Sequence, residues 1–168
     1  MRLRNRFATV FTAVAAVLLS GCTAPNPLIA THLNETAAFG GGVKLNPLQG
    51  KVITSWVDRR TAAMSTLTGN ETAVRYARAG GGPAYPAGST LSLATWGQVE
   101  DGRWFGARIP GAPRSVEIVT VSQDANGQRL YSYQKYEGAP LKRVVSREAG
   151  PADERLQFLI SQRASVLP

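Results

Sequence analysis

The stretch Val116–Val121 (VEIVTV) is the clearest strand in the sequence. β-branched residues fill most of its positions, and they favour extended backbone. Turn-forming segments bound it on both sides, residues 110–113 (PGAP) before it and residues 124–127 (DANG) after it. A short strand between turns is stable only when it pairs with neighbours, so this stretch predicts a sheet built from strands close in the chain.

Segments of similar character lie on both sides of this strand. Period-two alternation and turn residues at 85–88 (YPAG) and 100–102 (EDG) separate them. Short connections of this kind join antiparallel neighbours. We therefore expect an antiparallel sheet of about five strands, at residues 63–68, 89–96, 103–109, 115–121 and 129–136.

Helices are expected before and after the sheet and within it. Apolar residues recur at helical spacing in residues 48–60, and Asn70 is placed to cap a short helix that ends near Arg78. Residues 26–40 have the pattern of another short helix, and Asp153 opens a C-terminal one. The expected fold class is α+β: an antiparallel sheet flanked by N- and C-terminal helices, over residues 48–168.

The first 21 residues have the organisation of a signal peptide. Three arginines, Arg2, Arg4 and Arg6, precede an apolar stretch of 13 residues, from 7 to 19. That stretch is too short to span about 30 Å of hydrocarbon at about 1.5 Å per residue, but it has the length of a signal core. It ends in residues 19–22 (LSGC), which resemble the lipobox of bacterial lipoproteins.

The lipobox resemblance implies cleavage after Gly21 and acylation of Cys22 with fatty acids such as palmitate. Residues 22–47 are then the lipid anchor, a tether and a short helix, and the lipid bilayer is the first partner. Thr23, rather than Asp, at the second mature position favours the outer membrane over the inner one. The expected location is the bacterial cell envelope, facing the periplasm.

Charge and composition exclude several function classes. Without Arg2, Arg4 and Arg6, the 19 basic residues become 16 against 11 acidic ones, a net charge of +5 that is scattered along the chain and does not indicate nucleic-acid binding. Cys22 is the single cysteine and His32 the single histidine. No disulfide, thiol nucleophile or ordinary zinc site is therefore expected, and we assign no catalytic or metal-binding residue.

Three residues are candidates for a ligand pocket: Trp96, Trp104 and Arg108. In the expected strand 103–109, Trp104 and Arg108 share one face, and Trp96 lies across the hairpin. The alternatives are that the tryptophans pack in the core and that Arg108 points to solvent. If Arg108 points inward, it needs a partner such as Glu117 or an anionic ligand.

Several ordered strings between residues 51 and 138 resemble the cytochrome P-460 family. They are Ser65-Thr66-Leu67 leading into Gly69-Asn70, then Tyr85-Pro86-Ala87-Gly88, Trp104-Phe105-Gly106 and Tyr131-Ser132-Tyr133. The resemblance implies the fold of periplasmic c-type haem proteins that oxidise hydroxylamine or bind small gases. Functional members carry a C-x-x-C-H attachment site near the C-terminus and a lysine cross-linked to the porphyrin.

This sequence departs from the family at the haem attachment. Residues 161–163 and their surroundings contain no cysteine or histidine, and no lysine occurs between residues 85 and 121. We therefore expect no covalent haem and no other cofactor. Non-covalent haem would need one of the remaining axial ligands, which are His32, Met64, Tyr85, Tyr131 and Tyr133.

The expected function is accordingly that of a membrane-anchored envelope lipoprotein. Its haem-free, cytochrome P-460-like domain would bind a small ligand or an envelope protein, or serve only as a structural part of the envelope. The alternative is a redox enzyme or gas sensor with non-covalently bound haem.

Overall fold

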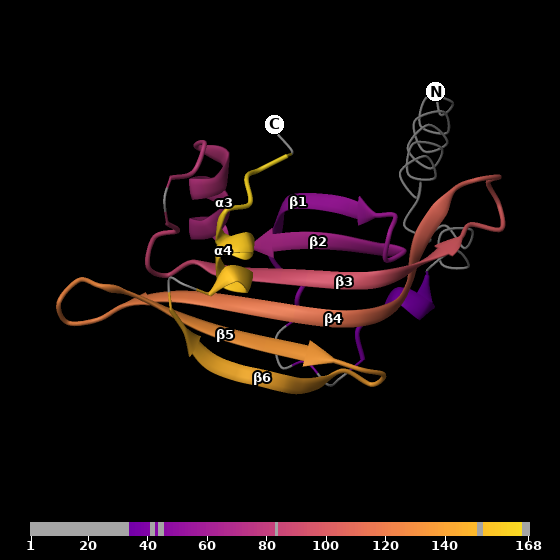
Figure 1. Cartoon of the computed structure of the whole chain (residues 1–168). Coiled ribbons are helices and arrows are strands. Elements are labelled where there is room, and N and C mark those ends of the chain that lie inside the picture. The colour runs from indigo at the N-terminus through magenta and orange to yellow at the C-terminus, as the bar shows by residue number, and fades with distance from the viewer. Residues whose placement is uncertain (1–33, 41–42, 44–45, 83, 151–152, 166–168) are drawn as a thin grey trace, which may run out of the picture. The chain divides into compact units, whose positions relative to one another are not determined.

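A six-stranded antiparallel sheet forms the body of the molecule in the computed structural model, which describes residues 34–40, 43, 46–82, 84–150 and 153–165. The strands follow one another in chain order, so each one pairs with the next (Figure 1). Their bounds are β1 Lys51–Asp58, β2 Ala63–Gly69, β3 Thr90–Glu100, β4 Arg108–Gln123, β5 Arg129–Glu137 and β6 Lys142–Ala149. Together with the helices, this confirms the expected α+β class.

Two α-helices, α3 (Glu71–Arg78) and α4 (Glu154–Ile160), cover one part of one sheet face, which we call the helix-side face (Figure 1). Asn70 caps α3 as expected, because its side chain accepts a hydrogen bond from the Ala73 amide at 3.1 Å. Asp153 caps α4 in the same way through the Leu156 amide at 3.0 Å. Both helix starts were therefore predictable from single polar residues.

The main core lies between these helices and the sheet. Aliphatic side chains from β1 to β4 meet small and apolar residues of both helices, and Tyr85 is completely buried among them. The most deeply buried aliphatic residues of this core are Ile53, Leu67, Leu91, Leu93, Val119, Val121, Leu156 and Leu159.

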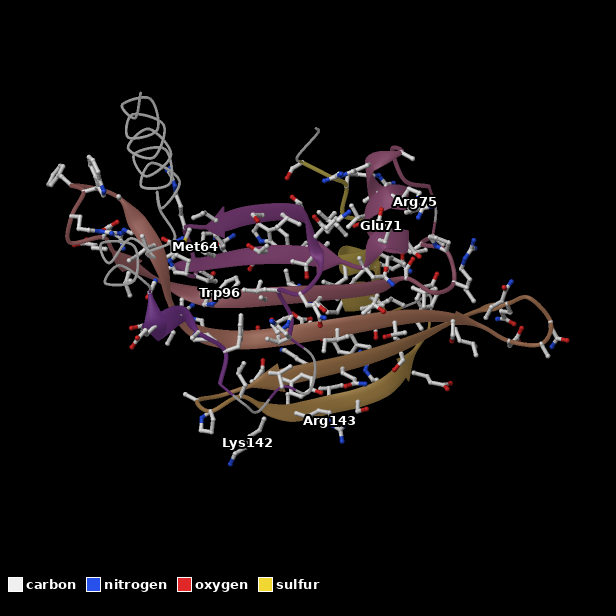
Figure 2. All side chains as sticks on the ribbon, turned by 180° about the vertical axis from the view of Figure 1, so that it is seen from behind. Met64, Glu71, Arg75, Trp96, Lys142 and Arg143 are labelled. Atoms are coloured by element: carbon white, nitrogen blue, oxygen red, sulfur yellow. The ribbon has the colours of Figure 1, made fainter. Side chains whose placement is uncertain are left out.

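A smaller core lies on the opposite face, which we call the back face. Phe39 and Val43 pack against a cluster that includes Val116 and Tyr136. Phe39 also contacts Trp96, with ring centroids 5.2 Å apart. Phe39 and Val43 thus cover part of the back face, on the same side of the sheet as the 3₁₀-helix η1 (Glu35–Ala37) (Figure 2).

The helix expected at residues 48–60 is wrong, because Lys51–Asp58 is the edge strand β1. The pairing with β2 is irregular between Val52 and Thr54, as at a β-bulge. The bulge lets Ile53 join the main core while Trp56, three residues later, packs against it from the same side. A spacing of three on one face imitates the helical period, which explains the error.

The strand expected at residues 103–109 is also wrong. Residues 101–107 form the loop of the β3–β4 hairpin, and β4 then runs from Arg108 through the segment 110–113 that we expected to be a turn. The β3–β4 register shifts twice, on both sides of Trp96, opposite the prolines of this segment. Proline cannot donate to a ladder, and such irregularities accommodate it within a strand. Strand β6 was not expected.

Several sequence predictions lie outside the described residues. They include the signal peptide, the acylation site Cys22 and His32. Of the short helix expected at 26–40, the described part contains only η1.

Candidate functional site

A polar cavity of about 570 Å³ opens on the helix-side face, beside α4. The two helices cover only part of this face, and the sheet beyond α4 is uncovered in Figure 1. The cavity is lined by residues from β1 to β5 and from α4, among them Trp56, Ser65, Thr95, Ser115, Glu117 and Lys135. Its floor is therefore the sheet itself.

The strand register builds this floor as a row across the sheet. Trp56 pairs with Ser65, Ser65 with Thr95 and Thr95 with Ser115. Directly paired residues point to the same face, so these side chains line up side by side. The Ser65 and Thr95 hydroxyl oxygens are 3.0 Å apart and share a hydrogen bond. Small hydroxyl side chains thus replace the aliphatic ones that occupy the same face under the helices.

Glu117 is the buried charge at this site. Only 2% of the residue is exposed, and its carboxylate accepts three hydrogen bonds. Arg155 donates from Nε at 2.7 Å and from Nη2 at 2.5 Å, and the Tyr133 hydroxyl donates at 2.6 Å. The two-pronged contact fixes the guanidinium of α4 against strand β4.

These contacts determine the ionisation of the cluster. Burial by itself raises the pKa of Glu117, but the hydrogen bonds from Arg155 and Tyr133 outweigh it and hold that pKa below its ordinary value of 4.5. Burial and the bond to Glu117 raise the pKa of Tyr133. At neutral pH the cluster is therefore a carboxylate, a guanidinium and a neutral phenol.

The walls of the polar cavity combine charged and aromatic groups. Lys135 pairs with Glu137 at 2.5 Å, and the Arg155 guanidinium lies 4.8 Å from the centroid of the Phe158 ring. Phe158 meets Trp56 edge-on, with centroids 5.8 Å apart and an interplanar angle of 81°. Each cation of the cavity has an acidic partner, and the lining also includes the carboxylate of Asp58, so the cavity has no excess of positive charge.

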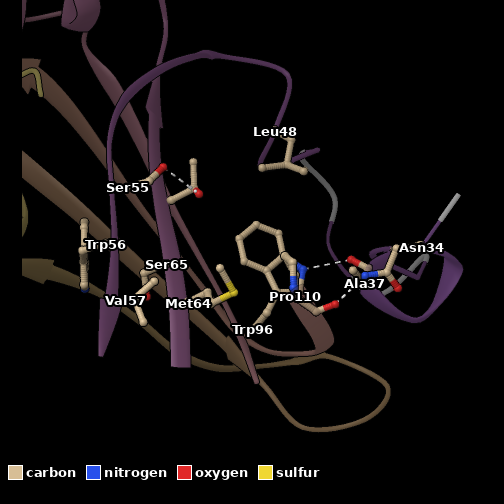
Figure 3. A pocket seen from close by; sticks show the side chains of 12 residues that line it. Asn34, Ala37, Leu48, Ser55, Trp56, Val57, Met64, Ser65, Trp96 and Pro110 are labelled. Carbon is tan, nitrogen blue, oxygen red and sulfur yellow. Dashed lines mark hydrogen bonds between the residues drawn. The ribbon is translucent and has the colours of Figure 1, made fainter. Parts of the chain in front are cut away.

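A second hollow, an apolar groove of about 490 Å³, lies on the back face (Figure 3). Met64 and Trp96 lie side by side in it, because they pair across β2 and β3. The Trp96 indole donates to the Ala37 carbonyl at 2.9 Å, which ties η1 to the sheet. Leu48, Val57 and Pro110 complete the apolar lining.

The structure does not bring the three candidate pocket residues together. Trp96 is buried in the back-face groove, whereas Trp104 is 70% exposed in the β3–β4 loop. Arg108 pairs with Glu100 at 3.4 Å, and the side chains of both are largely exposed. Of the two alternatives for Arg108, the structure therefore shows the solvent-facing one, and Arg155 rather than Arg108 contacts the Glu117 carboxylate.

The residues of the polar cavity were missed from the sequence, apart from Glu117 as a hypothetical partner and Trp56 as a tryptophan that could line a pocket. One signal was present: Glu117 is a charged residue on the strand face that it shares with Val119 and Val121. Its partner Arg155 lies 38 residues further along the chain, where no local pattern connects the two.

The candidate axial ligands for haem that lie within the described residues are engaged or partly covered. The Tyr85 hydroxyl donates to the Gln162 carbonyl at 3.2 Å, and burial raises the pKa of Tyr85 to about 12. Tyr133 is bound to Glu117, and Met64 lies in the apolar groove. Within the described part of the chain, no three His, Cys, Asp or Glu side chains are grouped so that they could hold a metal ion.

No protein-family model matches the chain, and a search of curated proteins finds no significant match. None of the helices in the described ranges has the length and apolar character needed to cross a membrane.

Proposed function

We propose that this chain is a lipid-anchored envelope protein whose sheet domain binds a small ligand in the polar cavity. The observation that carries the proposal is Glu117, a carboxylate buried in the floor of an open cavity and held by Arg155 and Tyr133. A few fixed polar groups at the base of a concave site are the usual means of orienting a ligand.

The composition of the floor supports a binding role over a purely structural one. A structural ion pair alone would not require the neighbouring positions to be Ser65, Thr95 and Ser115. Larger apolar side chains at those positions would fill the space and stabilise the sheet by burial. Small hydroxyls instead leave a hollow and supply both donors and acceptors.

The charges and the aromatic pair indicate the class of ligand. Because the cations are neutralised by Glu117 and Glu137, the cavity offers no strong field for an anion. Trp56 and Phe158 add an apolar wall. A small, uncharged molecule that both donates and accepts hydrogen bonds, such as a hydroxylated one, fits this lining best.

The proposed anchor rests on residues 19–22, whose LSGC sequence supports acylation of Cys22. We expect Cys22→Ser to lose fatty-acid incorporation and membrane fractionation. A variant that still incorporates labelled fatty acid would contradict the anchor. The relation to the cytochrome P-460 family also stays a proposal, supported by the order of the strings between residues 65 and 133.

The alternative function, with non-covalent haem, has one observation in its favour: Met64 faces an apolar groove. A thioether is a known axial ligand, but the groove lining described above contains no imidazole or thiolate to accompany it. The donor set fits haem poorly, and we propose a haem-free domain. Titration of the purified protein with haem tests this, since a saturable Soret band that disappears in Met64→Leu would favour the alternative.

Binding in the polar cavity is tested by a matched pair of variants on β2 and β3. Thr95→Val removes a hydroxyl from the cavity floor, and Thr66→Val removes one from the back face, where it bonds Ser55 at 3.0 Å. The full-length acylated protein in detergent is titrated with small sugars and polyols, with small carboxylates for comparison, and followed by NMR shifts.

We expect Thr95→Val to weaken binding about fivefold, because one net hydrogen bond is worth about 1 kcal/mol, and Thr66→Val to leave it unchanged. Equal effects of the two variants, or an effect of Thr66→Val alone, would contradict a site on the helix-side face. A preference for carboxylates would contradict the proposed ligand class.

A further inference from the structure

The loop of the β3–β4 hairpin presents two adjacent aromatic side chains to solvent. Trp104 is 70% exposed and Phe105 is fully exposed, more than any other large apolar residue of the described part. Exposing two neighbouring rings at the end of a hairpin is costly in water. Such a tip indicates a surface that is covered when the protein is in its working environment.

The loop is held in a defined conformation. Asp101 accepts hydrogen bonds from both the backbone and the side chain of Arg103, and its amide donates to the Ala107 carbonyl at 3.0 Å. The Ala107 amide donates to the Trp104 carbonyl at 3.0 Å, and Gly106 adopts a positive φ of 75° that closes the turn. The two rings are therefore displayed by an organised turn.

The charges near the tip cancel. Arg103 pairs with Asp101, and Arg108 pairs with Glu100. A docking surface for an acidic or basic partner would need an excess of one charge. The tip offers aromatic rings above a neutral polar base, which is the composition that favours the interface between lipid headgroups and acyl chains.

The tip lies at the end of the sheet where the described part of the chain begins. Asn34, the first described residue, donates from its side-chain amide to the carbonyl of Pro110, close to the base of this hairpin. Figure 1 shows η1 and the β3–β4 loop at the same end of the sheet. Cys22 lies 12 residues before Asn34, so an extended tether reaches at most about 40 Å.

We propose that Trp104 and Phe105 insert into the interfacial region of the bilayer that holds the acylated Cys22. The inference rests on the lipid anchor proposed above and adds a second contact, which fixes how the domain stands on the membrane. Acyl chains alone secure the protein to the bilayer but leave it free to rotate about the tether. With the tip inserted, the β3–β4 hairpin end of the sheet points toward the lipid, and neither face of the sheet is covered by lipid.

The experiment uses the full acylated protein in phosphatidylcholine vesicles, with and without bromine on the acyl chains near the headgroup. Bromine quenches tryptophan fluorescence at contact, and Trp104 is one of three tryptophans. The difference in fluorescence between the wild type and Trp104→Phe gives the contribution of Trp104. The variant keeps an aromatic side chain at the tip. We expect brominated lipid to quench most of that contribution, and added salt or anionic lipid to change it little.

Two further variants serve as the test and the control. Phe105→Ser removes the more exposed ring and is expected to reduce the quenching of Trp104 substantially. Val144→Ser removes an apolar side chain that is 54% exposed on β6, and is expected to leave quenching unchanged. Unaltered urea melts establish that both variants are folded.

The outcomes separate the tip from the anchor. Vesicle-bound, acylated protein whose Trp104 is not quenched overturns the insertion of the tip and leaves the anchor standing. Protein that carries no fatty acid and does not bind vesicles overturns the anchor, and the insertion proposal with it. Quenching that requires anionic lipid overturns the neutral, aromatic mode of contact.

Discussion

Replacing Glu117 by glutamine tests the structural basis of the polar cavity. The substitution keeps the size of the side chain and removes its charge. The side chain is only 3% exposed, so water cannot compensate for what is lost. The glutamine side chain retains one carbonyl oxygen, which can still accept a hydrogen bond from Tyr133 or Arg155. Its NH₂ group is a donor and cannot accept, so at least one hydrogen bond from Arg155 is lost.

The expected cost is about 2–3 kcal/mol in the free energy of unfolding. Hydrogen bonds to charged groups contribute about 1.5–3 kcal/mol each, and removing one partner of a fully buried pair costs about 3–5 kcal/mol. Here the Arg155 side chain is 44% exposed, so solvent can take over part of its donors. That places the cost below the range for fully buried pairs.

Urea denaturation at a series of pH values measures the effect. Because the folded pKa of Glu117 is below its ordinary value of 4.5, its charged form stabilises the fold above that value. This contribution is lost as the pH falls through the folded pKa. The difference between the wild type and Glu117→Gln should therefore be largest at neutral pH and shrink in acid.

The matched control is Glu148→Gln, which removes the same charge from an exposed position on β6. It should change stability by no more than about 0.5 kcal/mol. If Glu117→Gln costs no more than the control, or if its cost does not depend on pH below neutrality, the carboxylate does not organise the site as described.

Three other contacts have measurable consequences. Asn70→Ala should cost about 1–2 kcal/mol in urea melts, because its side chain caps α3 and also accepts from the Thr90 amide; a negligible loss would contradict both contacts. Trp96→Ala should cost about 3–5 kcal/mol and Trp104→Ala less than about 0.5 kcal/mol, and the reverse order would contradict their burial. Tyr133 should stay neutral until well above pH 10, because its folded pKa is raised. Its contribution to stability should be complete below pH 10 and lost as the pH rises through the folded pKa. Comparing the ultraviolet titrations of Tyr133→Phe and the wild type identifies this ionisation.

The parts of the fold that the sequence predicted are those with a local cause. Val116–Val121 lies within β4, and Asn70 and Asp153 cap helices through bonds that span three residues. Residues 63–68 fall within β2 for the same reason, since alternation and a following turn are local signals. The errors arose where pairing decides the structure.

Strand β1 illustrates the limit. Its apolar residues have a helical period only because a bulge inserts Ile53 into the face that Trp56 also occupies, and the bulge is a property of its pairing with β2. The hairpin loop at 101–107 is a second case. Its sequence, with Trp104 and Phe105, has the character of a buried strand unless one knows that β4 begins at Arg108.

The candidate site was missed for a different reason, although part of its signal is present in the sequence. On the helix-side face, β3 changes from Leu91 and Leu93 to Thr95, and β4 changes from Val121 and Val119 to Glu117 and Ser115. Helix α4 has seven residues and spans only about 10 Å at about 1.5 Å per residue, so it cannot cover the full length of these strands. Each strand therefore becomes polar where the helical cover ends, and the antiparallel register aligns those points across the sheet. A change from aliphatic to small polar residues at the same face of adjacent strands is thus a sequence signal for an open cavity, but it can be used only once the register is known.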